Sequence, residues 1–173
     1  MIIDVFRDNV IPLLNQDREE KVNYVWGDSS YIREYLSIMK KSSGTAPYRF
    51  PLIGLYSPID EMVDSEQYEA RAVVRIIIAV NTLPEYTNEQ RLEISFKKVL
   101  RPLYESLFRA IEKSKCFNIP YKGLSYTYTE NYTFGKRGAI DFDGKEIDEK
   151  IDAIEIKNLE LTIKKLNCYA QRL

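Results

Sequence analysis

The chain has 173 residues, of which 45% are apolar and 29% charged, which is the size and composition of one globular domain. The formal net charge is −1, so no basic excess exists to neutralise phosphates, and sequence-independent nucleic-acid binding is not expected. No stretch approaches 18 uncharged apolar residues, and the first residues lack a signal-peptide pattern. We therefore expect a single soluble domain, residues 1–173, that folds in a cytoplasm without contacting a membrane.

The first predicted element is a helix over residues 2–15. Apolar residues recur there at spacings of three and four, which places them on one helical face. Pro12 lies inside this pattern and has no amide hydrogen to donate. We therefore expect the helix to be kinked or to end near Ile11.

A short strand over residues 22–26 and a helix over residues 30–40 follow. Asp28 or Ser29 is suited to cap this helix, because both side chains accept hydrogen bonds from backbone amides. The loop over residues 42–47 is rich in Ser, Gly and Pro and separates the helix from the predicted sheet.

The strongest strand pattern runs from residue 68 to residue 80, after an apolar strand over residues 50–56. Its first half is apolar on one face only and its second half on both, which predicts a strand that leaves a solvated edge and enters a two-sided core. Glu69, Arg71 and Arg75 share the polar face. They form either an ordinary exposed charge ladder or one side of a subunit interface. Reversing both arginines is expected to leave the monomer folded, because exposed charges contribute little to folding.

Two acidic segments are interpreted as loops, over residues 58–69 and 141–152. The second only partly matches a calcium-binding loop, because Gly144 comes two positions early and Lys150 stands where glutamate is needed. Solvated loops are the plain interpretation, and a weak ion site is the alternative. The carboxylates singled out are Asp60, Glu61, Asp64 and Glu66 in the first segment, and Asp141, Asp143, Glu146, Asp148, Glu149 and Asp152 in the second.

The clearest helix pattern runs from Thr87 to about Ser114. Thr87 and Gln90 have the spacing of a capping box, and a continuous apolar stripe follows. Leu100 and Leu103 are expected in the core. Pro102 should kink the helix, because it cannot donate its backbone hydrogen bond.

Two late strands are predicted, over residues 124–134 and 153–166. In the second, the apolar phase slips at Lys157–Asn158, which is typical of a β-bulge. In the first, four aromatic residues share one face. This face is either a stacking platform or, more simply, a surface packed on the helix or another subunit. The four residues are Tyr126, Tyr128, Tyr132 and Phe134. Together these elements predict an α+β fold, with a mostly antiparallel twisted sheet packed against a long amphipathic helix and the N-terminal helices.

Histidine is absent, which removes the commonest general base and metal ligand. Cys116 and Cys168 are interpreted as buried thiols, with a single bridge as the alternative. No glycine-rich phosphate-binding motif occurs. We therefore expect no enzyme activity, catalytic residue, metal or cofactor. A glycosidase-like pair of catalytic carboxylates is left as an alternative.

Five segments together resemble the tail terminator and tail-completion proteins of long-tailed bacteriophages and prophages. They are the opening Ile2–Phe6, the strand Phe50–Tyr56, the strand end Ile76–Thr82, the capped helix Thr87–Tyr104 and the closing strand Ile154–Leu161. The resemblance is one of element order and covers most of the chain.

The resemblance implies a structural virion protein without enzyme activity, which forms a ring, usually of six subunits, at the end of the tail tube. It implies tail tube and neck proteins as partners, and DNA that passes through without specific binding. Assembly would take place in the bacterial cytoplasm, and the protein would then lie in the virion tail. On this view the acidic segments face the channel, and Glu69, Arg71 and Arg75 lie at the subunit interface. An intracellular small-ligand binding or carboxylate-dependent hydrolytic domain is the alternative.

Overall fold

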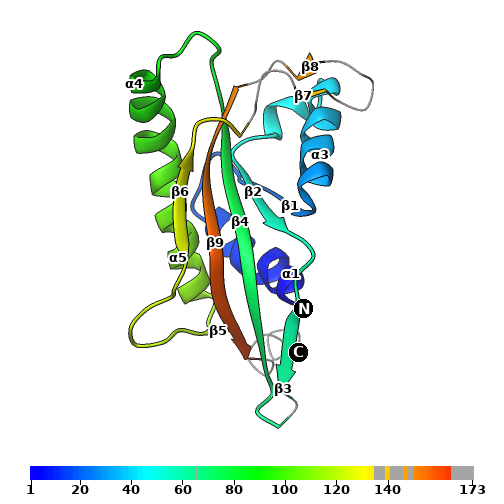
Figure 1. The fold of residues 1–173 in the computed structure, drawn as a ribbon, viewed down its shortest axis with the longest axis vertical. Helices are drawn as coiled ribbons and strands as arrows, with labels where there is room; N and C mark the ends of the chain where they lie inside the picture. The colour runs from blue at the N-terminus through cyan, green and yellow to red at the C-terminus, as the bar shows by residue number, and fades with distance from the viewer. Residues whose placement is uncertain (65, 135–138, 141–145, 148–149, 165–173) are drawn as a thin grey trace.

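The computed structural model describes residues 1–64, 66–134, 139–140, 146–147 and 150–164, and for 139–140 and 146–147 the backbone alone. One sheet of mixed but mostly antiparallel strands organises the molecule (Figure 1). Its main order is β1-β2-β4-β9-β5, while β3 pairs with β4 and β6 with β9. The strands are β1 Asn23–Gly27, β2 Leu52–Tyr56, β3 Glu61–Asp64, β4 Glu69–Thr82, β5 Phe117–Asn118, β6 Thr127–Asn131 and β9 Lys150–Lys164, and a separate ladder joins β7 Ala139–Ile140 to β8 Glu146–Ile147.

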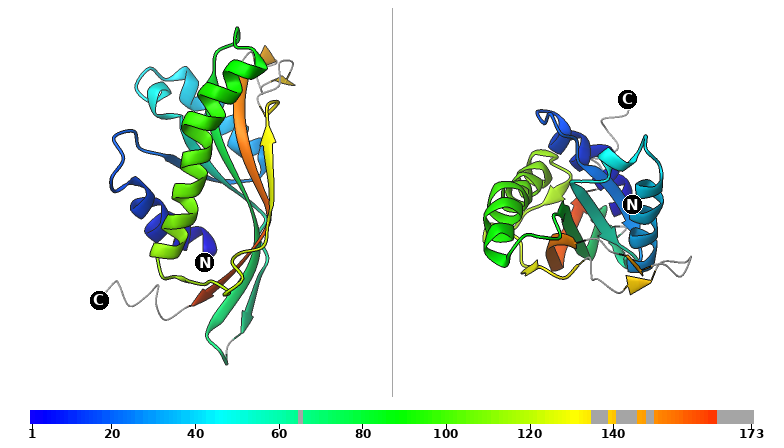
Figure 2. Two further views of the ribbon diagram at one scale, coloured as in Figure 1. Left: turned by 90° about the vertical axis from the view of Figure 1, so that its left-hand side faces the viewer. Right: turned by 90° about the horizontal axis from the view of Figure 1, so that it is seen from above.

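Helical segments cover the two faces of this sheet. Seen from above, the strands lie between the helical stretch 88–113 and α3 (Figure 2, right). The segments are α1 Ile2–Val5, η1 Phe6–Val10, α2 Ile11–Asn15, α3 Ser29–Lys41, η2 Ala46–Tyr48, α4 Asn88–Arg91, η3 Leu92–Leu100 and α5 Arg101–Lys113. The α+β prediction is confirmed, although the stretch 88–113 divides into three shorter segments. No helix among the described residues is long and apolar enough to cross a membrane.

Each of the two prolines that were expected to disturb a helix is the second residue after a π-helical segment. Pro12 comes after η1 and Pro102 after η3, each as the second residue of the next α-helical segment. The amide of Ile11 reaches back to the Phe6 carbonyl, five residues earlier. The wide turn makes room for the proline ring and absorbs the missing donor. The first helix therefore continues to Asn15 instead of ending near Ile11.

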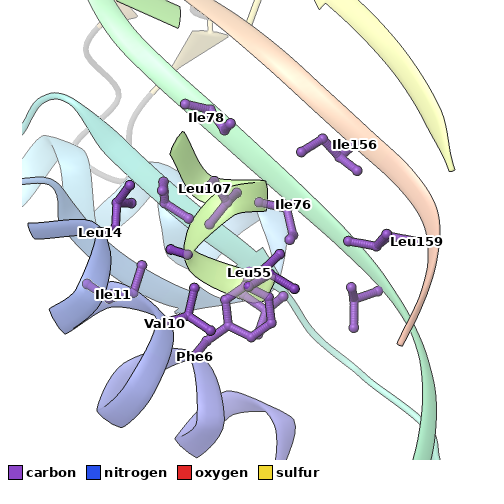
Figure 3. Packing of buried hydrophobic residues seen from close by; sticks show 14 of the residues in the cluster. Phe6, Val10, Ile11, Leu14, Leu55, Ile76, Ile78, Leu107, Ile156 and Leu159 are labelled. Carbon is purple, nitrogen blue, oxygen red and sulfur yellow. The ribbon is translucent and has the colours of Figure 1, made fainter. Parts of the chain in front are cut away.

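The alternation predicted for the strand at residue 68 is confirmed. Ile76, Ile78 and the other even-numbered apolar residues of β4 from Ala72 to Val80 pack with the N-terminal helices and with α5 in the larger core (Figure 3). Ile77 and Ala79 point to the opposite face and pack against Ile32 of α3 in a second core. Ile77 and Ile32 come close together over Gly54 of β2, where an added Cβ would lie 2.6 Å from Ile77 Cγ2 and 3.2 Å from Ile32 Cδ1.

Local signals at the element ends are also confirmed. The Asp28 side chain accepts hydrogen bonds from the Ser30 and Tyr31 amides at the start of α3. Both hydrogen bonds of the capping box form between Thr87 and Gln90. The bulge lies where the phase slips, since β4 and β9 change register there and Asn158 has a φ of 55°.

Two sequence interpretations need correction. Residues 58–69 are not simply a loop, because β3 forms there and pairs antiparallel with β4 over Glu61–Asp64. Phe134 leaves the face of Tyr126 and packs with the α3 core, because β6 ends at Asn131 and a turn follows. The phase of a strand predicts a side chain's direction only as far as the strand extends.

Candidate subunit interface

The helices cover one face of β4 along its length but leave the other face open over its first half. From Ile76 to Val80 every residue is buried, whereas Arg71, Val73 and Arg75 are exposed between buried neighbours. Figure 1 shows the β3–β4 hairpin extending past the helices. Among the described residues, this face over the first half of β4, the open half of the sheet, is the candidate interface.

Cross-strand rows define the chemistry of this surface. Met62, Arg71, Thr162 and Asn118 stand in one row across β3, β4, β9 and β5. The next rows place Val73 opposite Glu160, and Asp64 beside Glu69 and Lys164. Met62 is 70% exposed and Val73 is 55% exposed. Two apolar side chains therefore lie among charges of both signs, as in the mixed composition of protein interfaces.

The three residues expected at the interface differ in their surroundings. Arg71 is exposed at the centre of the open half. The Glu69 carboxylate accepts a hydrogen bond from the Asn118 side chain and is partly buried. Arg75 is bound within its own subunit, because its guanidinium donates to Glu155 Oε2 at 2.8 Å and lies 4.5 Å from the centroid of the Tyr56 ring. Arg75 is therefore not a neutral site for charge reversal, contrary to the expectation from sequence.

Glu155 is the buried centre of this charged group. Burial acts to raise the pKa of its carboxyl, but hydrogen bonds from Asn131, Arg75 and Lys157 outweigh burial and lower the pKa below its ordinary value. Burial also raises the pKa of the neighbouring Tyr56. Glu155 therefore stays ionised at neutral pH and holds Arg75 and Lys157 beside the bulge.

A cleft of about 480 Å³ lies beside this group. Its walls include Tyr56, Arg75 and Lys157, together with Asp28 and Ser29 at the start of α3. The Asp28 carboxylate accepts the capping hydrogen bonds of α3, so it is not available to form a catalytic pair with another carboxylate. Among the described residues, no cluster of potential ligands is arranged to hold a metal ion.

Among the described residues, the acidic side chains singled out from the sequence do not form one site. Asp60 and Asp64 are exposed, but the Glu61 carboxylate turns inward and accepts the Ile2 amide at 2.7 Å. Asp141 and Asp143 lie outside the described residues, as do Asp148 and Glu149, and Glu146 is placed by its backbone on β8. Cys168 is also outside them, and Cys116 is fully buried.

Asp152 corrects the prediction that its whole segment is a solvated loop. It lies in β9, is fully buried, and accepts from Arg91 Nε at 2.8 Å. Arg91 also donates to the Tyr132 carbonyl and lies 5.1 Å from that ring. This ion pair joins the start of the 88–113 helical stretch to β9. The sequence signal for this ion pair was a charged residue within each of two apolar patterns, and the pair was not predicted from the sequence.

The tyrosines in and beside β6 pack on the 88–113 helical stretch, as the plainer interpretation predicted. Tyr104 and Phe108 of α5 contact Tyr126, with ring centroids 6.3 Å and 4.8 Å apart, and the two tyrosine hydroxyls share a hydrogen bond. Burial, followed by the hydrogen bond with Glu130, raises the pKa of Tyr128 to about 12. These ring contacts pack β6 against α5, and the rings do not form a free stacking platform.

Comparison with known proteins adds no relative, since no protein-family model and no curated protein matches this chain.

Proposed function

We propose that the chain is a structural subunit of a phage or prophage tail, a tail terminator or head–tail joining protein that assembles into a ring, with six subunits expected from the resemblance. The observation that carries the proposal is the open half of the sheet. A fold with enough helix to cover both faces leaves one face bare where Met62 and Val73 lie among charges. An open sheet face that carries exposed apolar side chains among charges has the mixed composition of a surface that another chain can cover.

The geometry of the strands supports a ring. A ring interface is heterologous, so each subunit must offer two different surfaces that fit each other. The sheet has strand edges on both sides of its open half, at β3 and at β5.

The decisive experiment measures the mass of the purified protein over a range of concentrations. Sedimentation velocity and mass photometry should show one closed oligomer, and negative-stain electron microscopy should show rings. A chain that stays monomeric at the highest concentration, both alone and with purified tail tubes, contradicts the proposal.

The cleft beside Arg75 and Lys157 is the observation that favours the second candidate, an intracellular domain that binds a small ligand. Its volume suits a small molecule, and two cations at its wall suit an anion. A monomer whose melting temperature rises with an anionic metabolite would favour this candidate, because ligand binding stabilises the folded state. An assembled protein with an unchanged melting temperature would favour the ring.

A further inference from the structure

The open half of the sheet has two strand edges, which lie on opposite sides of the sheet and in the same cross-strand rows. Met62 on β3 and Asn118 on β5 belong to one cross-strand row, and Val63 and Phe117 belong to the next. Among the described residues, β3 pairs with β4 alone and β5 with β9 alone. Each edge therefore presents backbone groups that a further strand could pair with. Figure 1 shows the two edges on opposite sides of β4 and β9.

The edge at β3 is acidic and partly apolar. Residues 58–69 contain five acidic residues and no Lys or Arg. Asp60 and Glu66 are exposed on either side of β3. Met62 and Val63, on the strand itself, are 70% and 54% exposed. The Asp64 carboxylate has a different role, since it accepts from the Glu66 and Gln67 amides and shapes the turn.

The edge at β5 has the opposite charge. Residues 113–124 contain three lysines and no acidic residue. After β5, the Gly123 amide donates to the Pro120 carbonyl at 2.8 Å and closes a turn. That turn presents Tyr121, which is fully exposed, and Lys122 to solvent. Lys113 is exposed at the end of α5, just before the strand.

We infer that the β3 hairpin of one copy docks on the β5 edge and the Pro120–Gly123 turn of the next copy. The inference rests on the proposed ring and names its two surfaces. In one subunit β3 and β5 run in opposite directions, because β3, β4, β9 and β5 are successively antiparallel. Copies related by rotation about a ring axis would therefore bring the two edges together as antiparallel strands, and the sheet would continue from subunit to subunit.

The charges select this arrangement over a two-fold dimer. A β3 edge placed against another β3 edge would bring Asp60 and Glu66 near their own copies, and paired β5 edges would do the same for Lys113 and Lys122. Like charges at a contact suppress such pairings, whereas acidic against basic edges attract. A head-to-tail contact repeats from copy to copy, and it forms a closed ring when the rotation between neighbouring copies completes a full turn. Met62, Val63 and Tyr121 would supply the apolar part of the contact.

Charge exchange between the two edges tests the inference. One variant carries Asp60→Lys and Glu66→Lys, and the other carries Lys113→Glu and Lys122→Glu. Asp64 stays unchanged because it holds the turn. Each variant alone should raise the subunit dissociation constant at least about tenfold, because like charges meet at the contact. An equimolar mixture of the two variants should regain assembly, since acidic and basic edges meet at every contact of a ring in which the two variants alternate.

Matched controls are Glu85→Lys and Lys98→Glu, which change exposed charges away from both edges and should leave assembly unchanged. Circular dichroism checks that each variant is folded, and the neutral pair Glu66→Gln and Lys122→Gln replaces any variant that is not. A wild-type ring that tolerates both charge reversals overturns this inference and leaves the ring itself standing. A wild-type protein without any oligomer overturns the proposed function and this inference together.

Discussion

The two halves of β4 show how one strand can serve a core and an interface. Between Ile76 and Val80 helices cover both faces, and every side chain is buried. Between Glu69 and Arg75 only one face is covered, and buried and exposed residues alternate. On the proposed function, the covered half stabilises the fold and the open half contacts the neighbouring subunit. Substitutions in the two halves should therefore affect different measurements.

The largest effect is expected at the ion pair that joins the covered half to the 88–113 helical stretch. Asp152→Ala leaves Arg91 buried without its carboxylate, so the free energy of unfolding should fall by about 3–5 kcal/mol. Urea denaturation followed by circular dichroism measures this loss. The double variant Arg91→Met with Asp152→Leu is the control and should recover most of the stability, because no buried charge is left alone. A loss below about 1 kcal/mol for Asp152→Ala would show that the pair is solvated.

The next prediction compares the two halves directly. Ile77→Ala and Leu103→Ala each leave a cavity in a fully buried site and should cost about 2–5 kcal/mol of unfolding free energy. Val73→Ala, on the same face of β4 as Ile77 but in the open half, should change folding by less than about 0.5 kcal/mol. Denaturation of the monomer measures all three. Equal losses at Ile77 and Val73 would mean that another segment of the chain covers the open half.

The contribution of Glu155, at the boundary between the two halves, to the free energy of unfolding should depend on pH. The pKa of the Glu155 carboxyl is lowered in the folded protein, so its contribution to stability is complete above the ordinary value of about 4.3 and is lost as the pH falls through the folded value. Glu155→Gln should cost about 1–2 kcal/mol at pH 7, where charged hydrogen bonds are replaced by neutral ones. The difference from wild type should shrink as the pH falls from 5 to 3. A difference that does not depend on pH would show that Glu155 acts by packing alone.

The smallest effect on folding is expected at Arg71. Arg71→Glu should change the free energy of unfolding by less than about 0.5 kcal/mol, because the side chain is exposed, but it should weaken assembly. Arg75→Glu should lower both stability and assembly, because the new carboxylate would face the buried Glu155. Sedimentation velocity and circular dichroism separate the two quantities. Normal assembly of Arg71→Glu would remove the centre of the open half from the interface.

Much of the fold could be predicted from local patterns. The period of two along β4 indicated both its faces and the change from open to covered, because successive side chains point to opposite sides of a strand. The phase slip at Lys157–Asn158 indicated the bulge for the same reason. Caps were predictable because a cap and its helix are neighbours in sequence. The patterns did not reveal β3, since the apolar residues of this four-residue edge strand, Met62 and Val63, are adjacent and do not alternate with polar ones.

The sequence by itself determined the fold class, the alternation of β4, the bulge and the helix starts, because each depends on residues a few positions apart. Only the tertiary structure decided which charges meet. Arg75 finds Glu155 80 residues away, and Arg91 finds Asp152 61 residues away. It also decided that the acidic β3 and the lysines around β5 border opposite edges of one sheet at the same height. The physical reason is that strand order and register arise from the packing of the whole sheet, and no single segment carries that information.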